Sequence, residues 1–121
     1  MRLVSLASAA TLALILGASA QSAPPASLQV ATERAWQAAI KVHQSTNACS
    51  ASIGLPAAKA VVRYCRYMSG ATHPPCNSAN ACSDITDHIG FQVPAAPGEI
   101  IPGESTLHAS DWKTIGKLGA E

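Results

Sequence analysis

The residues best suited to chemistry in this 121-residue chain lie in one short polar stretch, Asp84-Ile85-Thr86-Asp87-His88. Asp84 and His88 are four residues apart, so on a helix they lie one turn apart on the same side. Carboxylate and imidazole groups are ordinary ligands of zinc and copper. With His73 or His43 as a further ligand, the spacing allows a mononuclear metal site. It is equally the spacing of a solvated polar helix face, which is what we expect here.

No other pattern in the chain indicates catalysis. The serines lack the GxSxG setting of a hydrolase nucleophile, and no pair of carboxylates has the context of a glycosidase. There is no CxxC motif of the kind used by disulfide oxidoreductases or structural zinc sites. We therefore expect a protein that is not an enzyme and has no cofactor.

The first 20 residues have the form of a cleaved signal peptide. Arg2 precedes an apolar run over residues 3–16, and Ala18-Ser19-Ala20 supplies small residues for cleavage before Gln21. The run is shorter than the roughly 20 residues that span a bilayer, and no cysteine follows it to carry a lipid anchor. We expect a periplasmic or secreted protein with no stable membrane insertion after cleavage.

Four cysteines in an exported chain of this size predict two disulfides, formed among Cys49, Cys65, Cys76 and Cys82. Three pairings are possible. Cys65 and Cys82 both lie on apolar faces of consecutive predicted helices, so we favour Cys65–Cys82 together with Cys49–Cys76. The competing arrangement is Cys76–Cys82 together with Cys49–Cys65.

The apolar periodicity predicts an all-α fold, a small three-helix bundle stapled by the two disulfides. A flexible leader at residues 21–27 precedes a helical domain over residues 28–92. Helices are expected at about 28–45, from Pro56 to a stop at Gly70, and at about 78–89 with Asn77 as the N-cap.

Residues 93–121 have a different character and are expected to form an extended tail. Residues 93–103 contain three prolines and two glycines, which is typical of a linker or strap. A short amphipathic helix follows at 111–118, with Trp112, Ile115 and Leu118 on one side. Such a short helix is marginal in water. It therefore either docks on the domain or anchors a partner.

A basic stripe follows the second predicted helix, with Lys59, Arg63 and Arg66 at positions i, i+4 and i+7. It would suit an anionic partner, or it is a solvated face partly paired with Asp84 and Asp87. The two readings stay open at this point.

The overall charge excludes one class of partner. The chain has eight Lys and Arg and seven Asp and Glu, and one of the eight is Arg2 in the signal segment, which leaves seven against seven. A nucleic-acid-binding protein normally carries a basic excess. The function we expect is binding of another macromolecule, a protein or an envelope component, in the periplasm or outside the cell. The alternative is a small exported metal-binding protein using Asp84, His88 and His73.

Overall fold

The computed structural model describes residues 25–70 and 74–119, so the predicted signal peptide and His73 lie outside the described residues. The described part is all-helical, without a β-strand, and its elements are α1 (Pro25–Lys41), α2 (Cys49–Ile53), α3 (Leu55–Ser69), α4 (Cys82–Gln92), the 3₁₀ helix η1 (Glu104–Thr106) and α5 (Ala109–Lys117). None of these helices is long and apolar enough to cross a membrane.

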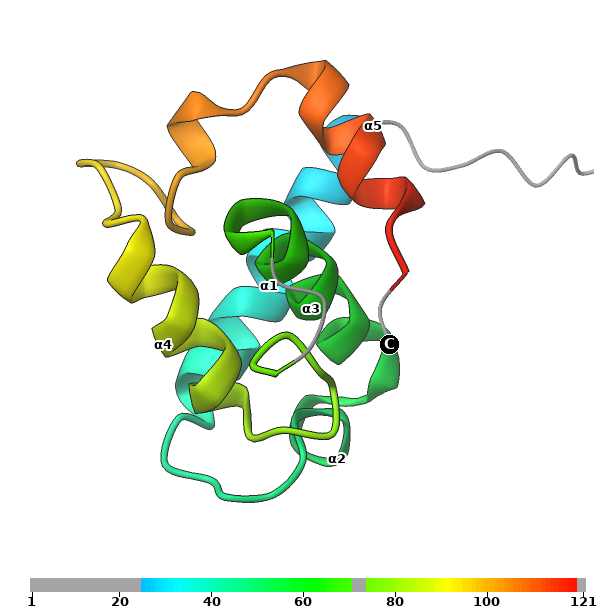
Figure 1. The fold of residues 1–121 in the computed structure, drawn as a ribbon, viewed down its shortest axis with the longest axis vertical. Helices are drawn as coiled ribbons and strands as arrows, with labels where there is room; N and C mark the ends of the chain where they lie inside the picture. Colours follow the sequence, from blue (N-terminus) through cyan, green and yellow to red (C-terminus); the bar gives the residue numbers. More distant parts are fainter. Residues whose placement is uncertain (1–24, 71–73, 120–121) are drawn as a thin grey trace, which may run out of the picture.

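Helix α3 is the centre of the fold and contacts α1, α2, α4 and α5 (Figure 1). Its bounds agree with the local signals in the sequence. Pro56 lies in the first turn, where a missing N–H costs nothing. Gly70 ends the helix with a φ of 68° and donates its N–H to the Arg66 carbonyl. The buried side chains of α3 are Ala58, Ala60, Val61, Val62, Tyr64 and Cys65.

Tyr64 joins four parts of the chain. Its ring packs edge-on against Trp36 of α1 and is stacked on Trp112 of α5, with both centroid distances at 5.8 Å. Its hydroxyl donates a hydrogen bond to the carbonyl of Pro102, and the ring is fully buried. Aromatic pairs at these separations are favourable beyond the area that they bury. Three of the five aromatic residues of the chain thus meet at one point of the core.

The helix starts differ from the predicted ones where polar side chains build turns instead. Asn77 does not cap a helix at 78, because its side chain accepts the N–H of Ala79 in a local turn and Asn80 donates to the Pro75 carbonyl. Such turns compete with helical hydrogen bonding. Helix α4 therefore begins only at Cys82. The five-residue helix α2 was not predicted at all.

The structure confirms two disulfides, but both sequence-based pairings are wrong. The bonds are Cys49–Cys82 and Cys65–Cys76. The reason is a contact that periodicity does not encode: Ala48 and Ala81 form an isolated antiparallel bridge, and Cys49 donates its N–H to the Asn80 carbonyl at 2.7 Å. This bridge brings together the first residues of α2 and α4. Two disulfides indicate an oxidising, extracytoplasmic location.

The C-terminal segment corrects the expectation of three helices with an extended tail. Helix α5 is docked, with Trp112 3% exposed and Ile115 fully buried. Within residues 93–107, hereafter the strap, Ile101 is also fully buried. The described part therefore has four helices of nine residues or more, together with α2 and η1. An alanine-rich bundle buries little area per side chain, and Trp112 and Ile115 supply apolar area that it otherwise lacks.

Candidate functional site

The structure places the predicted recognition side of α5 inside the molecule. Trp112 and Ile115 belong to the core, and Leu118 is half-buried. The Tyr67 hydroxyl of α3 also donates to the Asp111 carboxylate at 2.6 Å. That hydrogen bond, followed by one from the His108 N–H, lowers the pKa of Asp111. Of the two alternatives for this helix, docking on its own domain is the one observed.

The basic stripe of α3 lies beside the end of α5. Arg63 donates from Nε to the Leu118 carbonyl at 3.2 Å, and Arg66 donates to the Gly119 carbonyl. Lys59 is half-buried in the same row. The last carbonyls of a helix have no partner within the helix, so two guanidinium groups are well suited to satisfy them. Arg63 and Arg66 thus secure the C-terminal segment, and their acceptors are these carbonyls.

The strap is organised by two carboxylates that the sequence analysis missed. Glu99 accepts hydrogen bonds from the N–H groups of Ala96, Gly103 and Ser105 and from the Ser105 hydroxyl. The Ser105 hydroxyl, followed by the Ala96 and Ser105 N–H groups, lowers the pKa of Glu99 from 4.5 to about 2. The available signal was a repeat, because Pro-Gly-Glu occurs at 97–99 and again at 102–104.

The second carboxylate, Glu104, connects the strap to α1. It accepts the N–H groups of Ile100 and Ile101 at 2.8 and 3.2 Å. The Gln29 amide nitrogen donates to Glu104 at 2.9 Å and to Glu33 at 3.1 Å, so the two carboxyl groups lie together. Hydrogen bonding to Glu104, with partial burial, raises the pKa of Glu33. Burial opposes ionisation of Glu104, yet its hydrogen bonds with Glu33 and the strap amides lower its pKa on balance.

The predicted metal ligands are only partly brought together. Asp84 and His88 of α4 line one surface hollow of about 530 Å³ beside Pro74 and Pro75. His73 lies outside the described residues, so its position relative to them is not defined. Among the residues that the structure does describe, no three His, Cys, Asp or Glu side chains converge as a metal site would require. The metal site stays a prediction.

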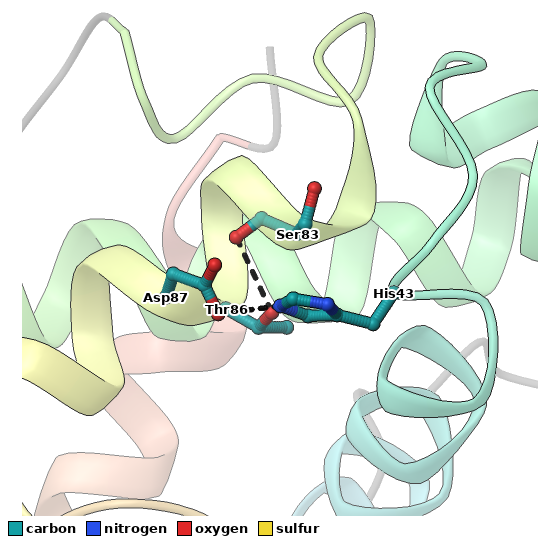
Figure 2. A network of polar contacts seen from close by, with 4 residues as sticks. All are labelled: His43, Ser83, Thr86 and Asp87. Atoms are coloured by element: carbon teal, nitrogen blue, oxygen red, sulfur yellow. Dashed lines mark hydrogen bonds and ion pairs between the residues drawn. The ribbon is translucent and has the colours of Figure 1, made fainter.

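The other candidate ligand, His43, has a different partner. Its Nε2 lies 2.8 Å from the Asp87 carboxylate, and both groups are at the surface (Figure 2). Next to this contact, the Thr86 hydroxyl donates to the Ser83 carbonyl at 3.4 Å within α4. The His43–Asp87 contact joins the segment after α1 to the middle of α4. Exposed pairs of this kind contribute little stability, and this one marks a point at which the end of α1 and α4 lie side by side.

A group of exposed apolar side chains is the most distinctive surface feature in the described part of the chain. Val30, Ile40 and Ile100 are 44–45% exposed, and Phe91, the only phenylalanine of the chain, is 89% exposed. We call these four residues the outer apolar surface. Val30 and Ile100 line one groove of about 400 Å³ on the outside of α1. The amide of Gln37 donates to the Ile100 carbonyl at 3.3 Å, which places this end of the strap against α1.

The register of α1 and α4 places Phe91 at about the same height along the bundle as Ile40. The two helices run in opposite directions (Figure 1) and meet where His43 contacts Asp87. Ile40 lies one turn before His43, and Phe91 lies one turn after Asp87. In antiparallel helices these steps lead the same way along the bundle, so Ile40 and Phe91 lie at about the same height.

Charged side chains lie among these apolar side chains and beside them on both helices. Arg34 and Lys41 of α1 line the groove with Val30 and Ile100. Asp84 lies on the same side of α4 as Phe91, two turns earlier, and is exposed. Within the described ranges 25–70 and 74–119, no ion pair or side-chain hydrogen bond involves Arg34 or Asp84. Two basic side chains of α1 and one acidic side chain of α4 are thus exposed on the two helices that carry most of the outer apolar surface.

The outer apolar surface was not predicted from the sequence, although one signal was available. Cys82, Ile85 and Ile89 follow one another at three- and four-residue steps on the buried face of α4, and Phe91 falls outside that face. A large aromatic residue on the polar side of a helix is the pattern to look for.

Comparison with protein-family models, curated proteins and solved structures finds no match for this chain.

Proposed function

We propose that this is an exported, non-enzymatic protein that binds another macromolecule, a protein, through the outer apolar surface. The observation that carries the proposal is the side chain of Phe91, which is 89% exposed on α4. Aromatic anchors of this kind, flanked by aliphatic side chains, commonly dominate the binding energy of protein interfaces. The exposed charges of Arg34, Lys41 and Asp84 on the same two helices add a means of selecting the partner.

The location that we propose is the periplasm or the extracellular space. The predicted signal peptide over residues 1–20 and the two disulfides both support it. A binding role also suits the fold, because a covalently stapled bundle holds the exposed side chains in fixed positions before the partner arrives. Preorganisation of this kind reduces the entropy lost on association.

The test compares two exposed apolar residues of one protein. Phe91→Ser removes the anchor, and Leu55→Ser is the matched control, because Leu55 is 49% exposed at the start of α3 and is not part of the outer apolar surface. Each tagged variant is cross-linked in the native envelope fraction, and the captured proteins are identified. We expect a partner captured by the parent and by Leu55→Ser to be lost with Phe91→Ser. Equal capture by all three proteins would refute this use of the surface.

Metal binding is the second candidate, favoured by the fact that Asp84 and His88 share one hollow. Zinc and copper titrations of the purified protein followed by calorimetry test it directly. Stoichiometric binding that is lost in both Asp84→Ala and His88→Ala would support a site there. Heat changes no larger than those of buffer would leave the two residues as a solvated polar face.

A further inference from the structure

The contact between the end of α3 and the strap contains one oxidisable side chain. We propose that Met68 is a modification site, at which a peroxide oxidises the thioether to the sulfoxide and thereby loosens the docking of the strap. The inference goes beyond the proposed function and does not depend on it, because it concerns how the strap is held on α3. Met68 is the only methionine of the chain apart from Met1, which belongs to the predicted signal peptide.

The strap is shaped around the Met68 side chain. Gly103 is buried, with a φ of 78°, and the space that a side chain there would need is filled by Met68. A Cβ on Gly103 would overlap the methyl carbon of Met68 and would lie 2.8 Å from Cγ1 of Val93 and 3.8 Å from the Met68 sulfur. The end of the thioether and the Val93 side chain therefore both lie directly against the Gly103 backbone.

Met68 lies one turn after Tyr64, on the same side of α3. The Tyr64 hydroxyl donates to the carbonyl of Pro102, and Met68 packs against the next residue, Gly103. Pro102 and Gly103 are both buried, so the strap enters the core at this point. One polar and one apolar contact from consecutive turns of α3 thus hold the same two residues of the strap.

The chemistry needs an oxidant that reaches the sulfur and no thiol that reacts first. Met68 is half-buried, so part of the residue faces solvent, which a molecule as small as hydrogen peroxide shares. All four cysteines are in disulfides, so no free thiol competes with the thioether. In the reaction a lone pair of the sulfur attacks one peroxide oxygen, an S–O bond forms and the O–O bond breaks. The sulfur loses two electrons, and the second oxygen leaves as water with the proton of the first.

The sulfoxide does not suit the place that the thioether occupies. Its oxygen is polar and accepts hydrogen bonds, whereas the thioether end lies against the Val93 side chain and the Gly103 backbone. The Gly103 N–H already donates to Glu99 at 3.3 Å. The sulfoxide oxygen therefore turns toward water, which draws the methyl group away from Gly103. Because Ile100 of the outer apolar surface lies in the strap, loosening the strap also alters that surface.

The first experiment treats the purified mature protein with hydrogen peroxide. Met68→Leu is the matched control, because leucine keeps an apolar side chain of similar volume that peroxide does not oxidise. Peptide mass spectrometry should locate one added oxygen at Met68 in the parent. We expect the melting midpoint of the parent to fall by at least about 4 °C, and that of Met68→Leu to be unchanged by peroxide. A parent that gains no oxygen at Met68 while a free methionine peptide is oxidised, or gains it without a change in midpoint, would overturn the inference.

The second experiment asks whether the strap is the part that loosens. Amide hydrogen exchange is followed by NMR in the untreated and the oxidised parent. We expect the amides of Ile101 and Gly103 to exchange at least about fivefold faster after oxidation, while those of Ile85 and Thr86 in α4 keep their rates. Equal acceleration in the strap and in α4 would show a general loss of stability and would refute the assignment to the strap.

A second variant, Met68→Gln, introduces polarity at the same place without an oxidant. Glutamine is unbranched like methionine, and its amide requires hydrogen bonds as the sulfoxide oxygen does. Its melting midpoint should lie below that of Met68→Leu by about the amount that oxidation removes from the parent. If Met68→Gln and Met68→Leu are equally stable, a polar group is tolerated against Gly103 and the inference is wrong.

Discussion

Removing one hydroxyl group from Tyr64 tests how the core of this protein is held together. The Tyr64→Phe variant keeps the ring that packs between Trp36 and Trp112, so the aromatic contacts persist. It loses the hydrogen bond that the hydroxyl donates to the Pro102 carbonyl, in a part of the strap that is buried. The burial of Tyr64 raises the pKa of its hydroxyl, so the group stays neutral and acts as a donor at all ordinary pH values.

The expected cost follows from what remains after the substitution. A buried carbonyl left without a donor costs about 1–3 kcal/mol. For a domain of this size each kcal/mol lowers the melting midpoint by roughly 4–8 °C. We therefore expect the free energy of unfolding to fall by about 1–3 kcal/mol and the melting midpoint to fall by at least about 4 °C.

Tyr67→Phe is the matched control, because it is the same change one turn later on α3. The Tyr67 hydroxyl bonds to the Asp111 carboxylate, which is within reach of solvent and also accepts the His108 N–H. Water replaces the lost hydroxyl donor at Asp111, so we expect the free energy of unfolding of Tyr67→Phe to fall by about 1 kcal/mol or less. Urea unfolding followed by tryptophan fluorescence measures the free energy of unfolding of both variants. A Tyr64→Phe variant no less stable than Tyr67→Phe would refute the assigned role of this hydroxyl.

Three further predictions follow from the disulfides, α5 and the strap. Replacing Cys49 and Cys82 by Ala should lower the free energy of unfolding by about 4 kcal/mol, and replacing Cys65 and Cys76 should lower it by about 3 kcal/mol. The difference arises because the first disulfide joins residues 33 positions apart and the second joins residues only 11 positions apart. A larger loss for the Cys65 and Cys76 variant, measured by urea unfolding, would contradict this. In a Trp36→Phe background, Trp112 should emit in the blue and resist acrylamide, since it is 3% exposed, and a red-shifted, quenchable emission would mean that α5 is undocked. The pKa of Glu99 is lowered from 4.5 to about 2 in the folded protein. The stability that the ionised Glu99 carboxylate gives to the folded state is therefore complete above pH 4.5 and is lost as the pH falls toward 2. Glu99→Gln should flatten the stability profile in that interval, and an unchanged profile would show that the strap does not depend on this carboxylate.

Local features of the sequence were sufficient to predict much of the helical architecture. Pro56 and Gly70 bracket α3 because one residue tolerates the first helical turn and the other adopts a left-handed φ at its end. The apolar spacing of Trp112, Ile115 and Leu118 predicted α5, which needs only a periodic pattern and a preceding break. An even number of cysteines predicted two disulfides. Each of these signals acts over a few residues or counts residue types.

Only the tertiary structure decided how these parts meet. The pairing of Cys49 with Cys82 depends on the bridge between Ala48 and Ala81, residues 33 positions apart, and no periodic pattern encodes such a contact. Docking of α5 depends on whether Tyr64 offers a surface for Trp112, which is a matter of shape. The exposure of Ile40 and Phe91 depends on which faces of α1 and α4 the other elements cover, and each residue taken alone is an ordinary exposed side chain. Helix formation is local, whereas burial and surface composition depend on all the elements at once, and this is why the sequence predicted the helices and not the site.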